Sequence, residues 1–156
     1  MTTDLTLHVA SFDELDAATL YRLLKLRTDV FVVEQKDPYP ELDGRDLEPS
    51  AVHLWLARGD EPVGYLRILD DPDGTARIGR VVVAADARGA GLSGRLMTAA
   101  LERIGGRRCV LAAQSHLANF YARFGFEVTG PEFLDGSIPH LPMTRPGTVR
   151  PGLRGL

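Results

Sequence analysis

A glycine-rich segment holds the residues with the clearest chemical potential in this sequence of 156 residues. Gly89, Gly91 and Gly94 stand between an apolar run that ends at Val83 and a segment with helical periodicity. The backbone N–H groups of such a turn, with the positive end of the helix dipole, form a binding site for an anion such as phosphate. The alternative is a tight connection in which glycine serves packing alone. The neighbouring residues distinguish these interpretations.

Two nucleotide-binding motifs share this glycine spacing, and the surrounding residues argue against both. The fingerprint of dinucleotide-binding folds needs an acidic residue roughly twenty positions further on, but residues 110–114 read Val-Leu-Ala-Ala-Gln. A P-loop needs a lysine and then a hydroxyl residue that binds Mg²⁺, whereas this sequence has Arg95 and Leu96 there. The remaining interpretation is a phosphate cradle that works without a metal, with Arg88 at its entrance.

Two motifs in this order resemble those of the Gcn5-related N-acetyltransferase (GNAT) family. Residues 88–93, Arg-Gly-Ala-Gly-Leu-Ser, are similar to its coenzyme-A motif, Arg/Gln-Gly-x-Gly-x-Gly/Ala, with serine in the last place. Residues 121–126, Tyr-Ala-Arg-Phe-Gly-Phe, are similar to its later tyrosine followed by Gly-Phe. Residues 26–35, 38–46 and 53–54 further resemble the ElaA-type subgroup. The resemblance covers nearly the whole chain except its carboxyl-terminal tail.

The resemblance implies how a cofactor, acetyl-CoA, would bind. In the family the pyrophosphate lies on the glycine turn, the peptide-like arm pairs with the preceding strand, and a backbone N–H of that strand, here near Val81, polarises the thioester carbonyl. Gln114 stands where many members have asparagine. The cofactor-binding residues expected on this basis are Val81, Val82, Val83, Arg88, Gly89, Ala90, Gly91, Leu92, Ser93, Gly94, Gln114, Asn119 and Tyr121.

Three side chains are candidates for catalytic proton transfer. Tyr121 matches the family's tyrosine near the thioester sulfur, where it would act as general acid; the alternative is a tyrosine packed between neighbouring phenylalanines. Glu34 is a candidate base because partial burial would raise its pKa; the alternative is a salt bridge to Arg27 or Arg80. His53 is a second candidate base, with ordinary strand packing as its alternative, and water can replace either base.

Residues 36–50 form a long connection with three prolines and five acidic residues. A connection of this length is more often functional or disordered than passive, and its prolines argue against disorder. Glu41, Asp43, Asp46 and Glu48 predict a negative border that attracts a cationic amine; the alternative is a solvated face. Neither these residues nor the four histidines have the spacing of metal ligands, so we expect no metal.

The most direct interpretation is an acyltransferase that moves an acetyl group from acetyl-CoA to a primary amine of a small molecule or peptide by direct attack. Two alternatives stay open. One is a non-catalytic acyl-CoA-binding sensor. The other is an enzyme similar to acyl-homoserine-lactone synthases, which share the Arg-x-x-Val-Phe pattern of residues 27–31. A homodimer is compatible with either class of function.

The elements that position these residues follow from hydrophobic periodicity and turn residues. Strands are expected over 5–9, 53–58, 63–69, 76–83, 108–113 and from 126, with the three strands of 53–83 in an antiparallel meander. Helices are expected after the capping box of Ser11 and Glu14, over 27–35, over 91–104 and over 117–124. The strand, helix and strand of 81–113 make a parallel unit. The predicted fold class is α/β, a central mixed antiparallel and parallel sheet with flanking helices.

Length and composition set the outer limits. The chain has room for one domain, expected over residues 1–145, with a flexible tail over 146–156 that is rich in Pro, Gly and Arg. A net charge of −3 provides no general attraction to nucleic acid or anionic lipid. No membrane-spanning run or signal peptide is recognisable, so a cytoplasmic location is expected. The single cysteine, Cys109, excludes an intrachain disulfide and is expected to be buried.

Overall fold

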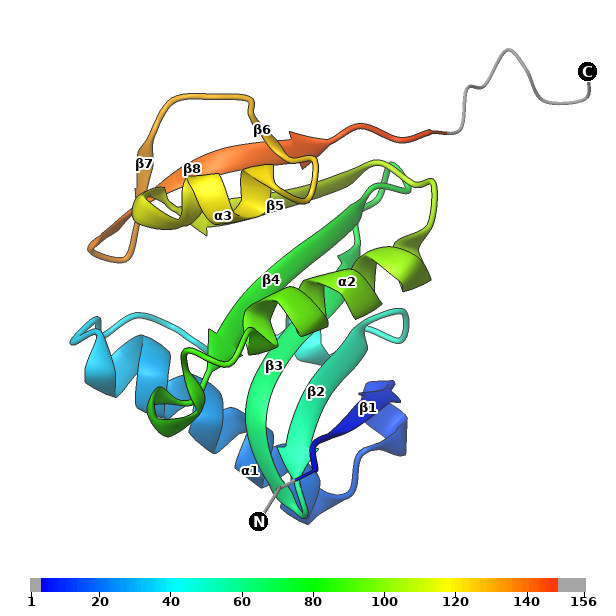
Figure 1. Cartoon of the computed structure of the whole chain (residues 1–156), viewed down its shortest axis with the longest axis vertical. Helices are drawn as coiled ribbons and strands as arrows, with labels where there is room; N and C mark the ends of the chain where they lie inside the picture. The colour runs from blue at the N-terminus through cyan, green and yellow to red at the C-terminus, as the bar shows by residue number, and fades with distance from the viewer. Residues whose placement is uncertain (1–3, 149–156) are drawn as a thin grey trace, which may run out of the picture.

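A computed structural model describes residues 4–148 of the chain. Eight strands form one sheet in the order β1-β2-β3-β4-β5-β8-β6, and β7 pairs with β8 (Figure 1). The strands are β1 (Thr6–Ala10), β2 (Val52–Arg58), β3 (Glu61–Asp70), β4 (Ala76–Val83), β5 (Cys109–Gln114), β6 (Glu127–Val128), β7 (Phe133–Asp135) and β8 (Ile138–Arg145). The helices are α1 (Ala17–Thr28), α2 (Leu92–Ile104) and α3 (Ala118–Ala122). The predicted mixed sheet with flanking helices is confirmed.

Strands β1 to β4 form an antiparallel meander, as the turn residues predict. Eight consecutive residues of β3 are buried, because helices cover both faces of this part of the sheet. One core cluster lies beneath α2 and includes the fully buried Leu96 and Met97. The other lies beneath α1 and includes Leu23, Trp55 and Tyr65. The meander is therefore a rigid base for residues at the ends of its strands.

The first helix begins later than the sequence predicts. Ser11 and Glu14 do form a capping box, with Glu14 Oε1 accepting from the Ser11 backbone N–H at 2.8 Å, but it closes only a single 3₁₀ turn, η1 (Phe12–Glu14). The longer helix, α1, starts at Ala17, where the Asp16 side chain accepts a hydrogen bond from the Thr19 N–H. A short polar motif fixes a cap but does not determine how far the helix after it runs.

The helix expected over residues 27–35 is a continuation of α1 in another geometry. Residues Asp29–Glu34 form a π-helical segment, η2, directly after Thr28. The wider turn changes the face that each following residue presents. The chain then turns at Lys36, which has a φ of 52°, and enters the irregular connection, whose one regular turn is the 3₁₀ segment η3 (Arg45–Leu47).

Strands β4 and β5 separate soon after they pair. They are parallel, as predicted, but only Ala76 and Arg77 pair with β5, opposite Cys109 and Val110. Further along, β4 contains a register shift against β3, and Arg80 there has a φ of 56°, which is unusual for a residue with a side chain. Strand β5 instead pairs along its whole length with β8. The sheet therefore opens into a V between β4 and β5 (Figure 1).

The remaining predictions concern the tail and the thiol. The Thr148 N–H donates to the Gly106 carbonyl at 2.9 Å, so the first tail residues, 146–148, lie against the turn after α2. Residues 149–156 lie outside the described part. Cys109 is fully buried, as predicted, and burial raises the pKa of its thiol to about 11. Among the described residues, no helix is both long and apolar enough to cross a membrane.

Candidate active site

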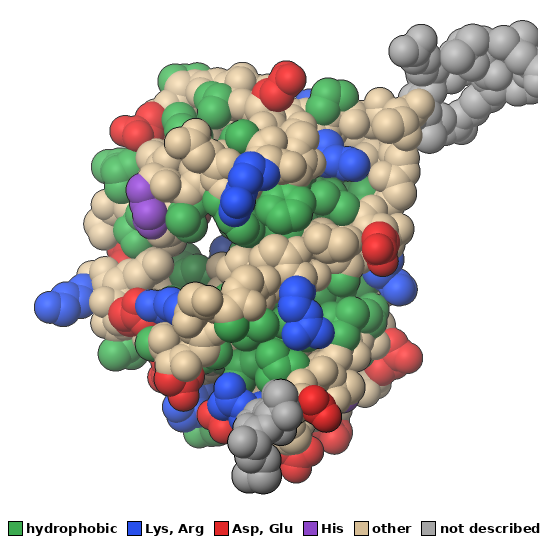
Figure 2. Space-filling model, viewed as in Figure 1, with side chains coloured by type: hydrophobic (Ala, Val, Ile, Leu, Met, Phe, Trp, Pro, Cys, Tyr) green, Lys and Arg blue, Asp and Glu red, His purple; other side chains and the backbone are tan. Residues whose placement is uncertain are grey.

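The opening between β4 and β5 forms a cleft of about 400 Å³. Apolar side chains from both strands line it, together with polar side chains of the 36–50 connection and the β7–β8 hairpin. The lining residues include Asp37, Tyr39, Asp43, Arg45, Arg67, Asp71, Arg77, Gly79, Arg80, Val81, Gln114, Tyr121, Asp135 and His140. In the space-filling view the surface is hollowed at this point (Figure 2).

The glycine turn has the geometry of an anion cradle. Gly89 and Gly91 have φ angles of 88° and 75°, a region that strains any residue with a Cβ. Gly91 caps the amino terminus of α2 without help from a side chain. The backbone N–H groups of residues 88–94 donate to no acceptor within the described part of the chain. This set of free donors, at the positive end of a thirteen-residue helix, fits a pyrophosphate group.

Arg88 and Glu34 form a pair at the entrance to this cradle. The Arg88 guanidinium donates to both Glu34 carboxylate oxygens, at 2.7 and 2.9 Å, and its Nε donates to the Val83 carbonyl. Both side chains are 43% exposed. The hydrogen bond and charge of Arg88 lower the pKa of Glu34, the reverse of the shift that a general base needs. The expectation of a buried Glu34 with a raised pKa was wrong; the salt-bridge alternative was right in kind, with Arg88 as the partner.

The other expected cofactor-binding residues are divided between the cleft and the core. Val81 lines the cleft, while the side chains of Val82 and Val83 pack into the two core clusters and offer only their backbone. Gln114 lines the cleft at the end of β5 and donates to Gln35 Oε1 at 3.2 Å. Asn119 is exposed on α3.

Tyr121 lies in the cleft wall, on α3. It is 6% exposed, it packs edge-on against Phe120 and Phe126, and burial raises the pKa of its hydroxyl to about 12. No described residue forms a hydrogen bond with this hydroxyl, so it is free to donate to a ligand in the cleft. The packing and the acid interpretations of Tyr121 are therefore compatible, since the ring packs while the hydroxyl stays available.

His53 is not brought to the cleft. It is 2% exposed in β2, with Nδ1 2.7 Å from the Tyr65 hydroxyl and Nε2 3.2 Å from the Asp46 carbonyl oxygen. Burial lowers its pKa. Both ring nitrogens are occupied by neighbours from the protein, so the packing alternative describes His53 and the base role does not fit its position.

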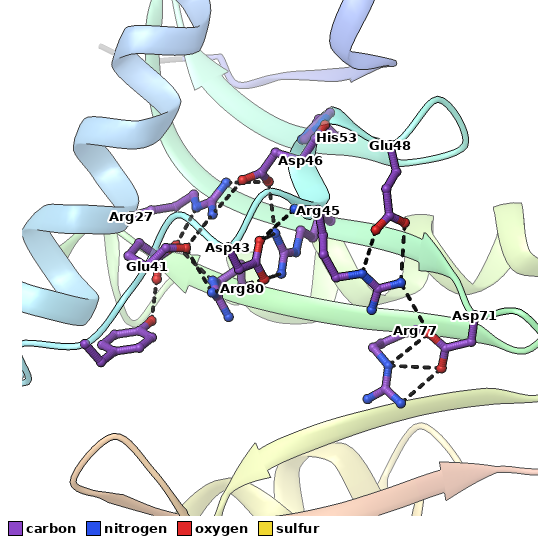
Figure 3. A network of polar contacts seen from close by, with 12 residues as sticks. Arg27, Glu41, Asp43, Arg45, Asp46, Glu48, His53, Asp71, Arg77 and Arg80 are labelled. Carbon is purple, nitrogen blue, oxygen red and sulfur yellow. Dashed lines mark hydrogen bonds and ion pairs between the residues drawn. The ribbon is translucent and has the colours of Figure 1, made fainter.

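The acidic connection is neutralised from inside the protein (Figure 3). Arg27, 1% exposed, donates to Glu41 Oε2 at 2.7 Å and to Asp46 Oδ1 at 2.8 Å. Arg67 and Arg80 complete the cluster with pairs to Asp43 and Glu41. These contacts hold the connection against β3 and β4. The predicted negative border was wrong, because arginines far away in the sequence reach these carboxylates.

A second set of ion pairs continues along the same wall. Arg45 pairs with Glu48 and with Asp71, and Asp71 also pairs with Arg77. Among described residues, Arg67 Nε is the buried side-chain donor that lacks an acceptor. Gly79 lines the cleft next to this nitrogen, and a Cβ built on Gly79 would lie 3.9 Å from it. The absence of a side chain at Gly79 therefore leaves free space beside Arg67 Nε.

Sequence reasoning missed two residues that the fold brings to the cleft. His140 of β8 lies opposite Gln114, and its Nδ1 is 2.8 Å from the Ile138 carbonyl, which leaves Nε2 as the nitrogen that can accept a proton. Asp37 lies opposite Ser137 of the β7–β8 turn. Neither belongs to a recognisable motif, because His140 is placed by the pairing of β8 with β5 and Asp37 by hydrogen bonds to Ser137. The described residues contain no group of three His, Cys, Asp or Glu side chains arranged to hold a metal.

The chain was compared with known families, curated proteins and solved structures. Residues 25–145 match the model of the acetyltransferase (GNAT) domain. A UPF0039 protein of Mycobacterium tuberculosis is 51% identical, over 86% of this chain and 89% of its own length. Protein ElaA of Escherichia coli is 41% identical over 85% of this chain and 90% of its own length.

Solved structures give the same result. An acyl-CoA N-acyltransferase from Pseudomonas aeruginosa has a TM-score of 0.85 at 42% identity, over 91% of this chain and 99% of that one. The crystal structure of Escherichia coli ElaA has the same TM-score at 37% identity, with the same coverage. Acyl-homoserine lactone synthases share the fold at 22% identity or less.

The split sheet and the glycine cradle thus define an acyltransferase of the CoA-dependent class. The chain belongs to the GNAT acetyltransferase family, and its resemblance to ElaA, inferred from residues 26–54, is confirmed over most of its length.

Proposed function

We propose that this protein transfers an acetyl group from acetyl-CoA to a primary amine of a small molecule or peptide by direct attack. The observation that carries the proposal is that a cradle of free N–H groups and a cleft with an available tyrosine hydroxyl meet at the end of one strand, β4. The cradle would hold the pyrophosphate, and the unpaired edge of β4 would hold the arm that reaches into the cleft. No metal enters the proposal.

The thioester supplies an acyl carbon to which the amine nitrogen bonds while the carbon–sulfur bond breaks. A backbone N–H at Val81, beyond the point where β4 separates from β5, stabilises the carbonyl oxygen. The Tyr121 hydroxyl protonates the departing thiolate. His140 Nε2 accepts the proton that the amine loses. A tyrosine with a raised pKa keeps its proton at neutral pH, as a general acid must.

The presence of both a donor and an acceptor of protons in one cleft favours an enzyme over a sensor. A sensor needs the cradle alone and gains nothing from Tyr121 and His140 at the opposite wall. The two classes differ in one measurable respect. An enzyme releases free CoA thiol when an amine is added, whereas a sensor binds the cofactor and releases none.

Calorimetric titration with CoA and a thiol-release assay with acetyl-CoA and a panel of amines test the proposal together. Gly91→Val should weaken CoA binding on the order of tenfold or more, because a side chain at a φ of 75° strains the turn and crowds the cradle. Ala90→Val is the matched control in the same turn and should cost less. Equal CoA affinity in Gly91→Val and the wild type would contradict the cradle. CoA binding without thiol release for any amine would favour the sensor.

A further inference from the structure

The charged residues around the cleft can be sorted by whether the protein itself neutralises them. All four arginines of the wall, Arg45, Arg67, Arg77 and Arg80, lie within 4 Å of a carboxylate. The carboxylates of Glu41, Asp43, Asp46, Glu48 and Asp71 are their partners, with Arg27 as the fifth cation. The charges of this network balance, five positive against five negative.

Two carboxylates of the wall stand outside this network. Asp37 and Asp135 both line the cleft, and neither has a cationic partner among the described residues. Asp135 is exposed on the β7–β8 hairpin, and Asp37 faces this hairpin from the connection after η2. The cleft wall therefore carries two negative charges that no arginine or lysine of the described chain offsets.

Asp37 is built into the structure rather than placed loosely on its surface. The residue is only 4% exposed, and its Oδ1 accepts from the Ser137 N–H at 3.0 Å and from the Ser137 hydroxyl at 2.9 Å. Its Oδ2 accepts no hydrogen bond from a described residue, yet it is not sealed from solvent. A Cβ at Gly136 would clash with both carboxylate oxygens of Asp37, so glycine at that position lets this carboxylate lie directly against the β7–β8 turn. A nearly buried carboxylate with one free oxygen calls for a positively charged ligand.

The reacting amine itself is poorly suited to be that ligand. A carboxylate contact favours the ammonium form and raises the pKa of the amine, whereas attack on a thioester requires the neutral form. A molecule with two amines avoids this conflict, since one stays charged and the other reacts. His140 and Tyr121, which line the same cleft, would then face the reacting end.

We propose that the acceptor is a diamine or polyamine whose distal ammonium group is held by Asp37 Oδ2 and Asp135. The inference rests on the proposed function and specifies its substrate class. Tyr39 adds an aromatic wall beside this subsite, where its ring stacks with the Arg80 guanidinium at 5.7 Å. An acceptor with a carboxylate at its distal end would meet two uncompensated negative charges and be rejected.

Three probes of equal backbone length test this proposal: putrescine with a distal ammonium, butylamine with a distal methyl, and γ-aminobutyrate with a distal carboxylate. Binding of each probe to the CoA-saturated protein is measured by calorimetry, and thiol release from acetyl-CoA is measured in parallel. We expect putrescine to bind on the order of tenfold more tightly than butylamine, as for a charged hydrogen-bonded pair. Weaker binding of γ-aminobutyrate than of butylamine is also expected.

Variants assign this preference to the two carboxylates. Asp37→Asn retains an oxygen that can accept from Ser137 and removes the charge, so it should lose most of the preference for putrescine over butylamine. Asp135→Asn should lose part of it. Asp13→Asn, an exposed carboxylate in η1 far from the cleft, is the matched control and should keep the preference. Ser137→Ala keeps the charge of Asp37 but removes a hydroxyl donor, and it should keep the preference too.

The outcomes separate this inference from the proposed function. Equal binding of putrescine and butylamine by the CoA complex, or an unchanged preference in Asp37→Asn, would overturn the inference while CoA binding and thiol release stand. An equal loss in Ser137→Ala would also overturn it, because the effect would then come from anchoring of the hairpin. If CoA itself does not bind, the proposed function fails, and the probes titrated into the protein alone still decide whether the carboxylates select a diamine.

Discussion

Replacing Arg27 by methionine should destabilise the protein far more than replacing Arg45, a partly exposed arginine near the cleft. Arg27 donates to Glu41 and Asp46 at 2.7 and 2.8 Å, is 1% exposed, and lies with its guanidinium 5.4 Å from the centre of the Tyr65 ring. Methionine fills similar space but removes the most deeply buried cation of the network, so Glu41 keeps only its pair with Arg80 and Asp46 only its pair with Arg67 among the described residues. Removal of one member of a buried pair costs about 3–5 kcal/mol of the free energy of unfolding. Total stability is about 5–15 kcal/mol, so this loss is a large fraction of the free energy of unfolding.

The assay is urea denaturation followed by fluorescence of the single tryptophan, Trp55, which is 7% exposed in the core cluster beneath α1. Arg45→Met is the matched control, because the Arg45 side chain is 32% exposed and its pair with Glu48 lies at the surface. Arg45→Met should lower the free energy of unfolding by about 1 kcal/mol or less. A loss in Arg27→Met no larger than that of the control would refute the reasoning.

Lowering the pH gives a second test, because the direction in which the stability of each protein changes can be worked out. In the wild type the arginines hold the pKa of Asp46 below its usual value, so Asp46 contributes stability that is present above the unfolded pKa and lost as pH falls through the folded pKa. In Arg27→Met the folded pKa of Asp46 should rise, because the larger of its two arginine contacts is lost while the pair with Arg67 remains. The stability gap between the two proteins should therefore narrow as the pH falls from the folded pKa of Asp46 in the variant towards its lower folded pKa in the wild type. A gap that stays constant over this range would contradict the electrostatic cause.

Three further predictions concern the proposed proton transfers and the cradle. Tyr121→Phe should retain CoA affinity in calorimetry while kcat falls on the order of 10²-fold or more, and unchanged turnover of a good amine would leave Tyr121 with packing alone. His140→Gln should lower kcat at neutral pH and lose part of the effect at alkaline pH, where the amine is already deprotonated; a uniform loss at every pH would speak against proton transfer. Glu34→Gln should keep kcat and its pH profile within about twofold, since Glu34 is paired with Arg88 and has a lowered pKa. A loss of kcat that grows towards low pH in the wild type and disappears in Glu34→Gln would restore Glu34 as the base.

Elements defined by neighbouring residues could be predicted from the sequence. The strands from Val52 to Val83 and helix α2 follow from alternation, turns and helical spacing, and the structure has them within a few residues. The glycine turn was predictable for the same reason, because its conformation depends on Gly89 and Gly91 themselves. The late start of α1 was not predictable, since the capping box at Ser11 is satisfied by a single turn.

Features that depend on distant partners could not be predicted. The charges of Glu41 and Asp46 suggested attraction of a substrate, but Arg27 lies fourteen and nineteen residues away from them in sequence and reaches both through the fold. His53 looked suitable as a base until its two neighbours, Tyr65 and the Asp46 carbonyl, were known. His140 and Asp37 stood in no motif: strand pairing brings His140 to the cleft, and hydrogen bonds to Ser137, a hundred residues away in sequence, hold Asp37 there. Charge and residue type alone do not show which side chains are paired within the fold and which stay available to a ligand.

The hydrogen bond between Gln35 and Gln114 also decides how a ligand can enter. Strands β4 and β5 diverge after their last paired residues, Arg77 and Val110. On the far side of the opening, residues 35–37 contact the β5–β8 side of the sheet through hydrogen bonds to Gln114 and Ser137. In the space-filling view the opening is surrounded by chain (Figure 2). A ligand that leaves the hydrogen bond between Gln35 and Gln114 intact therefore enters the opening end first, along its axis.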